Sequence, residues 1–218
     1  MSINQNQPRL SHYSFAEEVL NALTHGFGLV LSVIGVVFLI FQATIYGTEI
    51  HLFSYIIFGS SLIAVYLSST LYHSFSNTKF HLLLKKIDHL AIYFLIAGTY
   101  TPLLLIGING PKSIAMLWLV WALVLVSCYC KLSKNKILQK IAFLNYLIMG
   151  WLIVVIFDEV MLYMPQTSLY LLMVGGILYT SGVIFYCWEK LRFSHSIWHM
   201  FVLGGSTSHY FSIYFLLG

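Results

Sequence analysis

The chain has 218 residues, of which 59% are hydrophobic and only 8% are charged, and its mean hydropathy is +0.85. Soluble domains carry about 25% charged residues, so this composition excludes an ordinary soluble protein and indicates an integral membrane protein. The net charge of +4 comes without a continuous basic patch, which argues against nucleic-acid binding.

Residues 1–18 are polar and are predicted to form an N-terminal tail, followed by one transmembrane domain over residues 19–218. Within that domain, seven apolar stretches approach the ~20 residues that cross a bilayer as a helix. The connections between them are too short for a soluble domain. The predicted fold class is therefore all-α, an integral membrane bundle of seven transmembrane helices. The predicted stretches are 22–42, 53–74, 88–107, 114–130, 141–157, 168–188 and 195–217.

Two features should shape the packing of these helices. Pro102 lies inside the third stretch and is predicted to kink it, because proline lacks the N–H that continues the helical ladder. The pairs Gly175–Gly176 and Gly204–Gly205 are predicted to allow neighbouring helices to approach closely.

The basic residues predict the topology. Ten of the eleven fall on one side of the alternating chain, and Lys112 alone falls on the other. Cytoplasmic loops are rich in lysine and arginine, so we expect a cytoplasmic N-terminus and an outside C-terminus in a multi-pass protein of the cell membrane. The ten are Arg9, Lys79, Lys85, Lys86, Lys131, Lys134, Lys136, Lys140, Lys190 and Arg192.

This topology gives every polar residue a depth. Titratable and amide side chains from four separate helices are predicted to share the cytoplasmic level, within about two helical turns of the interface. They are Glu18, Asn21, His25, His73, Asp88, His195 and His199.

The spacing of the histidines indicates a metal centre. His195 and His199 are i, i+4 and share one helix face, as do Ser69 and His73. Three imidazoles and an open water position form a common catalytic zinc arrangement. Asp88 could hold that water or orient a ligand, and Ser69 could hydrogen-bond the same water. A polar hydrogen-bond network without metal is an equally open reading of these residues.

The remaining polar residues are predicted to have structural roles. Glu18, Asn21 and His25 share one helix face and should line the site entrance or cap the first helix, a structural cluster being favoured over catalysis. His209 lies about 15 Å deeper than His199, too far to bind the same ion, and should be a hydrogen-bonded interior residue. Solvated positions in the tail or loops are expected for His12, His51 and His81, and Asp158 and Glu159 are predicted to be interfacial charges at the outside end of the fifth helix.

The ordered motifs resemble those of one known family. ExxNxxTH spans residues 18–25, SxxxH spans 69–73, Asp88 follows, and HxxxH spans 195–199. As a set they resemble the haemolysin III family, the bacterial branch of the progestin and adiponectin receptor superfamily, which is related to alkaline ceramidases. The resemblance covers residues 17–218 and implies a zinc ion bound on the cytoplasmic side by His73, His195 and His199.

The resemblance leaves the activity open. The family name suggests cytolysis, the eukaryotic relatives are receptors, the ceramidase relatives hydrolyse lipid amides, and bacterial members have been linked to membrane lipid homeostasis. The leading hypothesis is zinc-dependent hydrolysis of a lipid amide or ester. Asp88 would orient or deprotonate the water, and Ser69 would position it or stabilise the oxyanion. The expected partners are the bilayer and a lipid or fatty-acyl ligand.

Two alternatives belong to other functional classes. One is a receptor or regulator in which zinc is structural and fully coordinated. The other is a pore-forming cytolysin, which ranks last because the outer halves of the predicted helices carry few polar residues.

Overall fold

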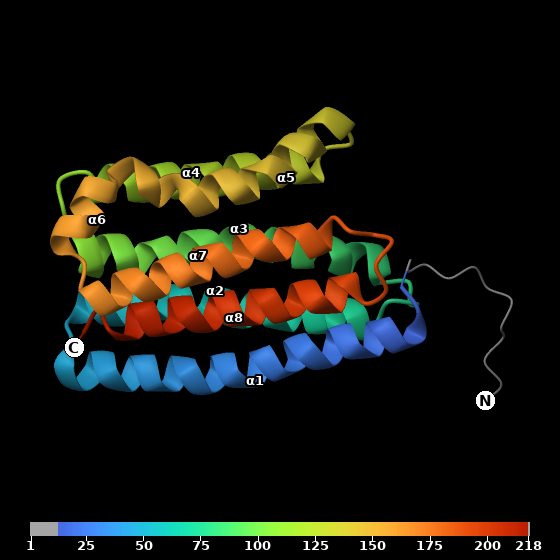
Figure 1. Cartoon of the computed structure of the whole chain (residues 1–218), viewed down its shortest axis with the longest axis horizontal. Coiled ribbons are helices and arrows are strands. Elements are labelled where there is room, and N and C mark those ends of the chain that lie inside the picture. The colour runs from blue at the N-terminus through green and yellow to red at the C-terminus, as the bar shows by residue number, and fades with distance from the viewer. Residues whose placement is uncertain (1–12, 218) are drawn as a thin grey trace, which may run out of the picture.

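The computed structural model describes residues 13–217, and over that range the long elements are all helical and run side by side as a seven-helix bundle (Figure 1). All seven predicted stretches correspond to helices. The third is continued by a π-helical segment, and the fifth by a 3-10 segment and a short helix. The bounds are α1 Phe15–Tyr46, α2 Glu49–Ser74, α3 His81–Pro102 with η1 Leu103–Ile108, α4 Ser113–Leu132, α5 Lys136–Trp151 with η2 Leu152–Ile156 and α6 Phe157–Tyr163, α7 Gln166–Tyr186, and α8 Ser194–Tyr214.

The first helix begins inside the segment predicted as a polar tail. Ser14 and Glu17 form a capping box, in which the Glu17 N–H donates to Ser14 Oγ at 3.3 Å and the Ser14 N–H donates to Glu17 Oε2 at 2.9 Å. This reciprocal pair satisfies two backbone donors that a helix start leaves free. The helix therefore extends about two turns before the apolar stretch begins, and it carries Glu18 with it.

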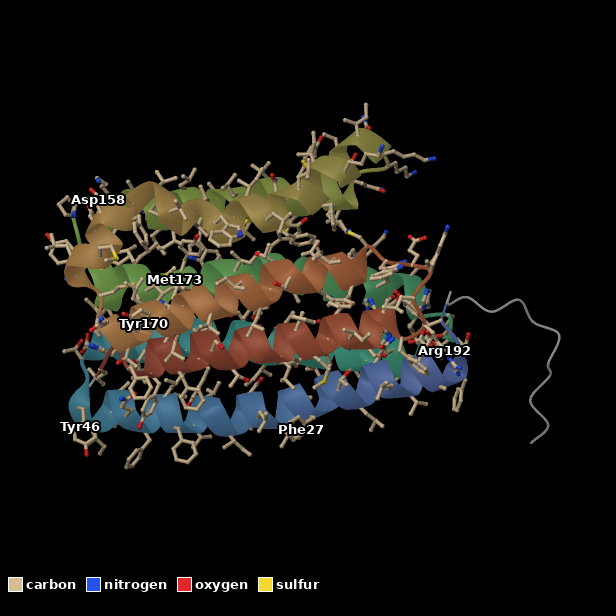
Figure 2. The ribbon with its side chains drawn as sticks, in the orientation of Figure 1. Phe27, Tyr46, Asp158, Tyr170, Met173 and Arg192 are labelled. Atoms are coloured by element: carbon tan, nitrogen blue, oxygen red, sulfur yellow. The ribbon has the colours of Figure 1, made fainter. Side chains whose placement is uncertain are left out.

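Six of the seven long helices are apolar and long enough to cross a bilayer. Their outer faces carry large apolar side chains such as Phe27 and Tyr46, which are 57% and 73% exposed and point away from the bundle (Figure 2). Lipid is the solvent that suits such a surface. Together these features make the chain a multi-pass membrane protein.

The seventh long helix, α8, is more polar than α7 but has the same length. It packs against α7 and α1 (Figure 1). Two of its polar side chains form hydrogen bonds with those neighbours. Ser212 Oγ donates to the Ser168 carbonyl of α7 at 2.7 Å, and Tyr210 Oη donates to the Gly35 carbonyl of α1 at 3.0 Å. Polar groups within a membrane are stable when they find such partners.

Two interruptions break the α-helical ladder. The ladder of α3 gives way to the wider π-helical turns of η1 directly after Pro102, which follows from the missing N–H. The break after α5 is bridged by Tyr100, whose hydroxyl donates to the Met149 carbonyl at 2.9 Å and accepts from the Ile153 N–H at 2.8 Å. The backbone groups freed by the break are thus satisfied internally, as the bilayer requires.

The glycine pairs do not all serve packing. A Cβ at Gly205 would lie 2.8 Å from the Tyr179 ring, and one at Gly175 would overlap His209, so both positions require glycine for close approach. At Gly176 a Cβ would meet no atom within 4 Å. The prediction that Gly176 brings helices together is therefore wrong, because it faces open space.

The two ends of the bundle differ in charge. Arg192 lies at the end where α1 starts, and Asp158 lies at the opposite end (Figure 2). There Lys112 Nζ forms an ion pair with Asp158 at 2.6 Å, and this hydrogen bond raises the pKa of Lys112. Glu159, predicted to be an interfacial charge, is buried at 6% exposure and accepts from the Lys112 N–H at 3.3 Å, where α4 begins. An acidic group at a helix N-terminus is electrostatically favourable.

Candidate metal centre

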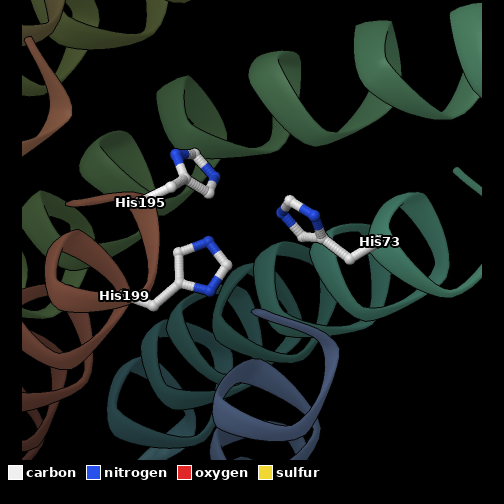
Figure 3. Close-up of side chains that lie close together, drawn as sticks. All are labelled: His73, His195 and His199. Carbon is white, nitrogen blue, oxygen red and sulfur yellow. The ribbon is translucent and has the colours of Figure 1, made fainter. Parts of the chain in front are cut away.

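Three histidines from two helices converge near the end of the bundle where α1 begins. His73 lies in the last turn of α2, and His195 and His199 lie in the first turns of α8, with the three rings pointing into a common space (Figure 3). One nitrogen from each ring lies within 4.8 Å of the other two, which makes the group able to hold a metal ion. Zinc–nitrogen bonds are about 2.0–2.1 Å, so nitrogens on one ion are at most about 4 Å apart. In a tetrahedral site the nitrogens are about 3.4 Å apart, so the rings would close by at most about 1.4 Å to bind one ion.

Glu18 orients the first histidine. Its Oε2 lies 2.6 Å from His73 Nδ1, and both side chains are buried. A carboxylate accepts, so Nδ1 carries the hydrogen and Nε2 keeps its lone pair. His73 Nε2 is buried and has no hydrogen-bond partner among the described residues. Metal-ligating histidines characteristically donate their other ring N–H to a carboxylate or carbonyl.

His199 is oriented in the same way from α1. Its Nδ1 lies 3.2 Å from the Asn21 carbonyl oxygen and 3.1 Å from Thr24 Oγ1. Since the carbonyl can only accept, Nδ1–H donates and Nε2 is left with a lone pair. Asn21 also contacts α8 through its side chain, because Ser196 Oγ donates to Asn21 Oδ1 at 2.5 Å. Helix α1 thus fixes two of the three rings in the tautomer that a metal requires.

Aromatic rings surround the third histidine. The Tyr13 ring stacks on the His195 ring with centroids 4.9 Å apart and planes at 28°, and Tyr186 lies 6.0 Å from the same ring. Burial raises the pKa of the Tyr13 hydroxyl, so Tyr13 stays neutral at physiological pH. Tyr13 covers the metal centre from the end of the bundle, and its position before α1 in a polar segment gave no sequence signal for this role.

A further polar group lies beside the metal centre. His25 Nδ1 and Ser69 Oγ are 2.7 Å apart, and the Asp88 carboxyl interacts with the same Ser69 hydroxyl. The His25 ring stacks face to face on His199, with centroids 3.5 Å apart and planes at 10°. The structure therefore brings the SxxxH serine, the aspartate that follows it and the first-helix histidine next to a candidate ligand.

The metal centre opens on a partly open cavity of about 180 Å³ between α3, α5, α7 and α8. His25, Ser69, Asp88, His195 and His199 line one end of it. Most of the remaining lining is aliphatic and aromatic, and His209 lines it deeper in the bundle. A cavity needs about 10–15 Å³ to hold one water. This cavity is many times larger, so it can hold a chain-like ligand.

The structure also places the other polar residues considered from the sequence. Glu18 and Asn21 do not line the cavity but contact the histidines and α8, whereas His25 does line it. His209 is hydrogen-bonded to the Leu172 carbonyl at 3.2 Å, as predicted for an interior residue. The prediction of a solvated His81 is wrong, because its side chain is buried at the start of α3 beside Tyr72. His12 lies outside the described residues.

The chain is similar to known proteins over most of its length. A family model described as "Haemolysin-III related" matches residues 13–210. The chain is 43% identical over 203 residues to the "Hemolysin-3 homolog" of Bacillus subtilis, covering 93% of this chain and 95% of the relative. It is 43% identical over 199 residues to "Hemolysin-3" of Bacillus cereus, covering 91% of each. It is also similar to the human "Monocyte to macrophage differentiation factor", at 29% identity over 205 residues, 91% of this chain and 83% of the relative.

Proposed function

This chain belongs to the haemolysin III family, and from that premise and the geometry of the site we propose that it is a zinc-dependent hydrolase of a lipid amide or ester in the membrane. The observation that carries the proposal is a single juxtaposition. Two of the three histidines able to hold a metal, His195 and His199, line one end of an apolar cavity together with the Asp88 carboxyl and the Ser69 hydroxyl, and His73 lies beside them.

Zinc is the metal we assign to His73, His195 and His199. Neutral imidazoles with buried, oriented nitrogens suit zinc better than calcium or magnesium, which prefer oxygen ligands. When bound, zinc would act as a Lewis acid and lower the pKa of a bound water toward about 7.

The chain's own residues supply the rest of the chemistry. Asp88 is the candidate general base, because a carboxylate beside the metal centre can take a proton from water and return it to the leaving group. Ser69 is the candidate group that orients the water or donates to the developing oxyanion. His25 holds the Ser69 side chain in place through the 2.7 Å contact. The apolar cavity would exclude bulk water and bind an acyl chain beside these groups.

Two other functions are less well supported. A receptor or regulator with structural zinc would need a closed coordination sphere, and the metal-capable group among residues 13–217 has three members, which leaves a fourth position open. The relatives named hemolysin suggest cytolysis. A water-filled pore requires a polar lining, whereas this cavity is lined mainly by apolar side chains.

The decisive experiment compares the zinc-loaded protein with Asp88→Asn and His199→Ala on a broad lipid extract, with released fatty acid measured by mass spectrometry. Asp88→Asn should keep zinc at saturating metal and lose about 10²–10⁴-fold in rate. His199→Ala should lose both zinc and release. Equal release from all three would come from a contaminant, and no release by fully zinc-loaded wild type would favour the receptor or regulator.

A further inference from the structure

The deep half of the cavity contains a histidine that the proposed chemistry does not use. His209 lies ten residues after His199 on α8, which is about 15 Å further along the helix. It lines the same cavity as the metal centre, yet it is too distant to bind the same ion. A histidine inside a membrane protein is costly unless its polar atoms are used.

The tautomer of His209 is fixed by α7. His209 Nε2 lies 3.2 Å from the Leu172 carbonyl oxygen, which can only accept, so Nε2 carries the hydrogen. In the neutral ring, Nδ1 is then a hydrogen-bond acceptor. Within residues 13–217 the hydrogen bond of the His209 side chain is made through Nε2, and none is made through Nδ1.

The packing of the His209 ring against α7 shows which way Nδ1 faces. A Cβ at Gly175 would lie 2.5 Å from His209 Nε2 and would overlap Cδ2, so the Cδ2–Nε2 edge rests directly on the α7 backbone. Nδ1 is the ring atom opposite that edge. Nδ1 therefore faces away from Gly175, and His209 is one of the residues that border the cavity.

The hydroxyl groups that border the cavity beyond the metal centre cannot supply the missing donor. Three of them already donate their hydrogen to a backbone carbonyl: Thr99 to Leu95 at 2.8 Å, Tyr100 to Met149 at 2.9 Å, and Thr180 to Gly176 at 2.8 Å. The hydroxyl of Tyr179 is engaged with Ser206 Oγ at 2.7 Å, a contact in which either oxygen can donate. This part of the cavity thus presents acceptors without free hydroxyl donors. A ligand that matches it must bring its own hydrogen-bond donor.

We propose that the region around His209 is a recognition subsite for a lipid whose chain carries a neutral donor, such as a hydroxyl, about 15 Å from the metal centre. The inference rests on the proposed function, because it assumes that the cavity binds a lipid. It deepens that function by assigning the substrate class: chain-hydroxylated lipids should be preferred over plain ones. A charged donor does not fit, because the surrounding lining is mainly apolar.

The test measures binding and needs no turnover. Purified full-length protein is titrated with octadecanoic acid, its mid-chain hydroxy isomers and the matching keto acids, with displacement of a fluorescent fatty acid as the readout. A hydroxyl at the matching position should tighten binding about 3- to 10-fold over the plain chain, as one buried hydrogen bond would. The keto chain should show no gain, because a ketone only accepts.

Variants locate the effect. His209→Phe should abolish the preference for the hydroxy isomer while still binding the plain chain, and Thr207→Val, on the exposed face of α8, should keep it. The wild-type comparison stands even if His209→Phe misfolds. Equal binding of all chains, or a preference that survives His209→Phe, would overturn the inference without touching hydrolysis. A hydroxyl preference in zinc-loaded protein that releases no fatty acid would sink the hydrolase proposal alone.

Discussion

The Nδ1 atom of His73 lies 2.6 Å from Oε2 of Glu18, so a carboxylate in the first turn of α1 holds a candidate metal ligand in the last turn of α2. The contact is buried on both sides. It explains why the helix must begin inside a polar segment: without the Ser14–Glu17 capping box, Glu18 would not be placed within reach of His73.

Removing this carboxylate should weaken metal binding. Glu18→Ala is expected to lower zinc affinity about 10- to 100-fold, the usual cost of losing a partner that orients a ligating histidine. Glu18→Gln should fall in between, because its amide oxygen can still accept from Nδ1. Competition against a zinc chelator measures the affinity. Glu189→Gln, at an exposed position, serves as the control, and unchanged affinity in Glu18→Ala would contradict the assigned role.

The three histidines should act as one metal site. Purified protein is expected to contain about one zinc per chain, and His73→Ala, His195→Ala and His199→Ala should each lose it. His209→Ala should retain it, because it lies about 15 Å along the helix from His199. Elemental analysis of each variant decides this, and retention of full zinc by His195→Ala would refute the ligand set.

Zinc binding should also depend on pH. Only the neutral imidazole ligates, so protons compete with the metal and zinc affinity should fall as the pH is lowered. The loss should be steeper than for a single ligand, because three rings must all be deprotonated. Chelator competition at several pH values measures the slope. A flat profile would mean that the ion is held by other groups.

The sequence predicted the number of helices and the identity of the histidine group for different physical reasons. Apolar runs count helices because the bilayer imposes their length. His73 and His195 were predicted to lie at the same depth, because the alternating direction of the helices places the end of the second helix and the start of the last helix at the same face of the membrane. The hydrogen bond of Glu18 to His73 and the stacking of His25 on His199 were not predicted, because they depend on how α1 is rotated and on how closely it approaches α2 and α8. The sequence alone determines neither the rotation of a helix about its axis nor its distance from its neighbours.

The orientation in the membrane is a prediction that the fold alone does not decide. Because the helices alternate in direction, every second loop lies at the end of the bundle where α1 begins. These are the loops at 75–80, 133–135 and 187–193, and they carry or adjoin most of the lysines and arginines. The positive-inside rule places that end in the cytoplasm. Reporter fusions in these loops should be cytoplasmic, and a fusion after residue 217 should be outside. A cytoplasmic C-terminus would move the metal centre to the other face.

Two adjacent glycines on α7 offer a matched pair of stability tests. Gly175→Ala adds a methyl group that would lie 2.5 Å from His209 Nε2 and 3.1 Å from the Gly205 carbonyl oxygen, both on α8. The helices must separate or the imidazole must leave its seat, which should destabilise the fold by about 1–3 kcal/mol, as overpacking does. Gly176→Ala meets no atom within 4 Å and should be neutral or slightly stabilising, because alanine favours a helix by about 1 kcal/mol over glycine. Thermal unfolding in one detergent gives both values. If the two variants unfold at the same temperature, the close seating of His209 on α7 is not present in the folded protein.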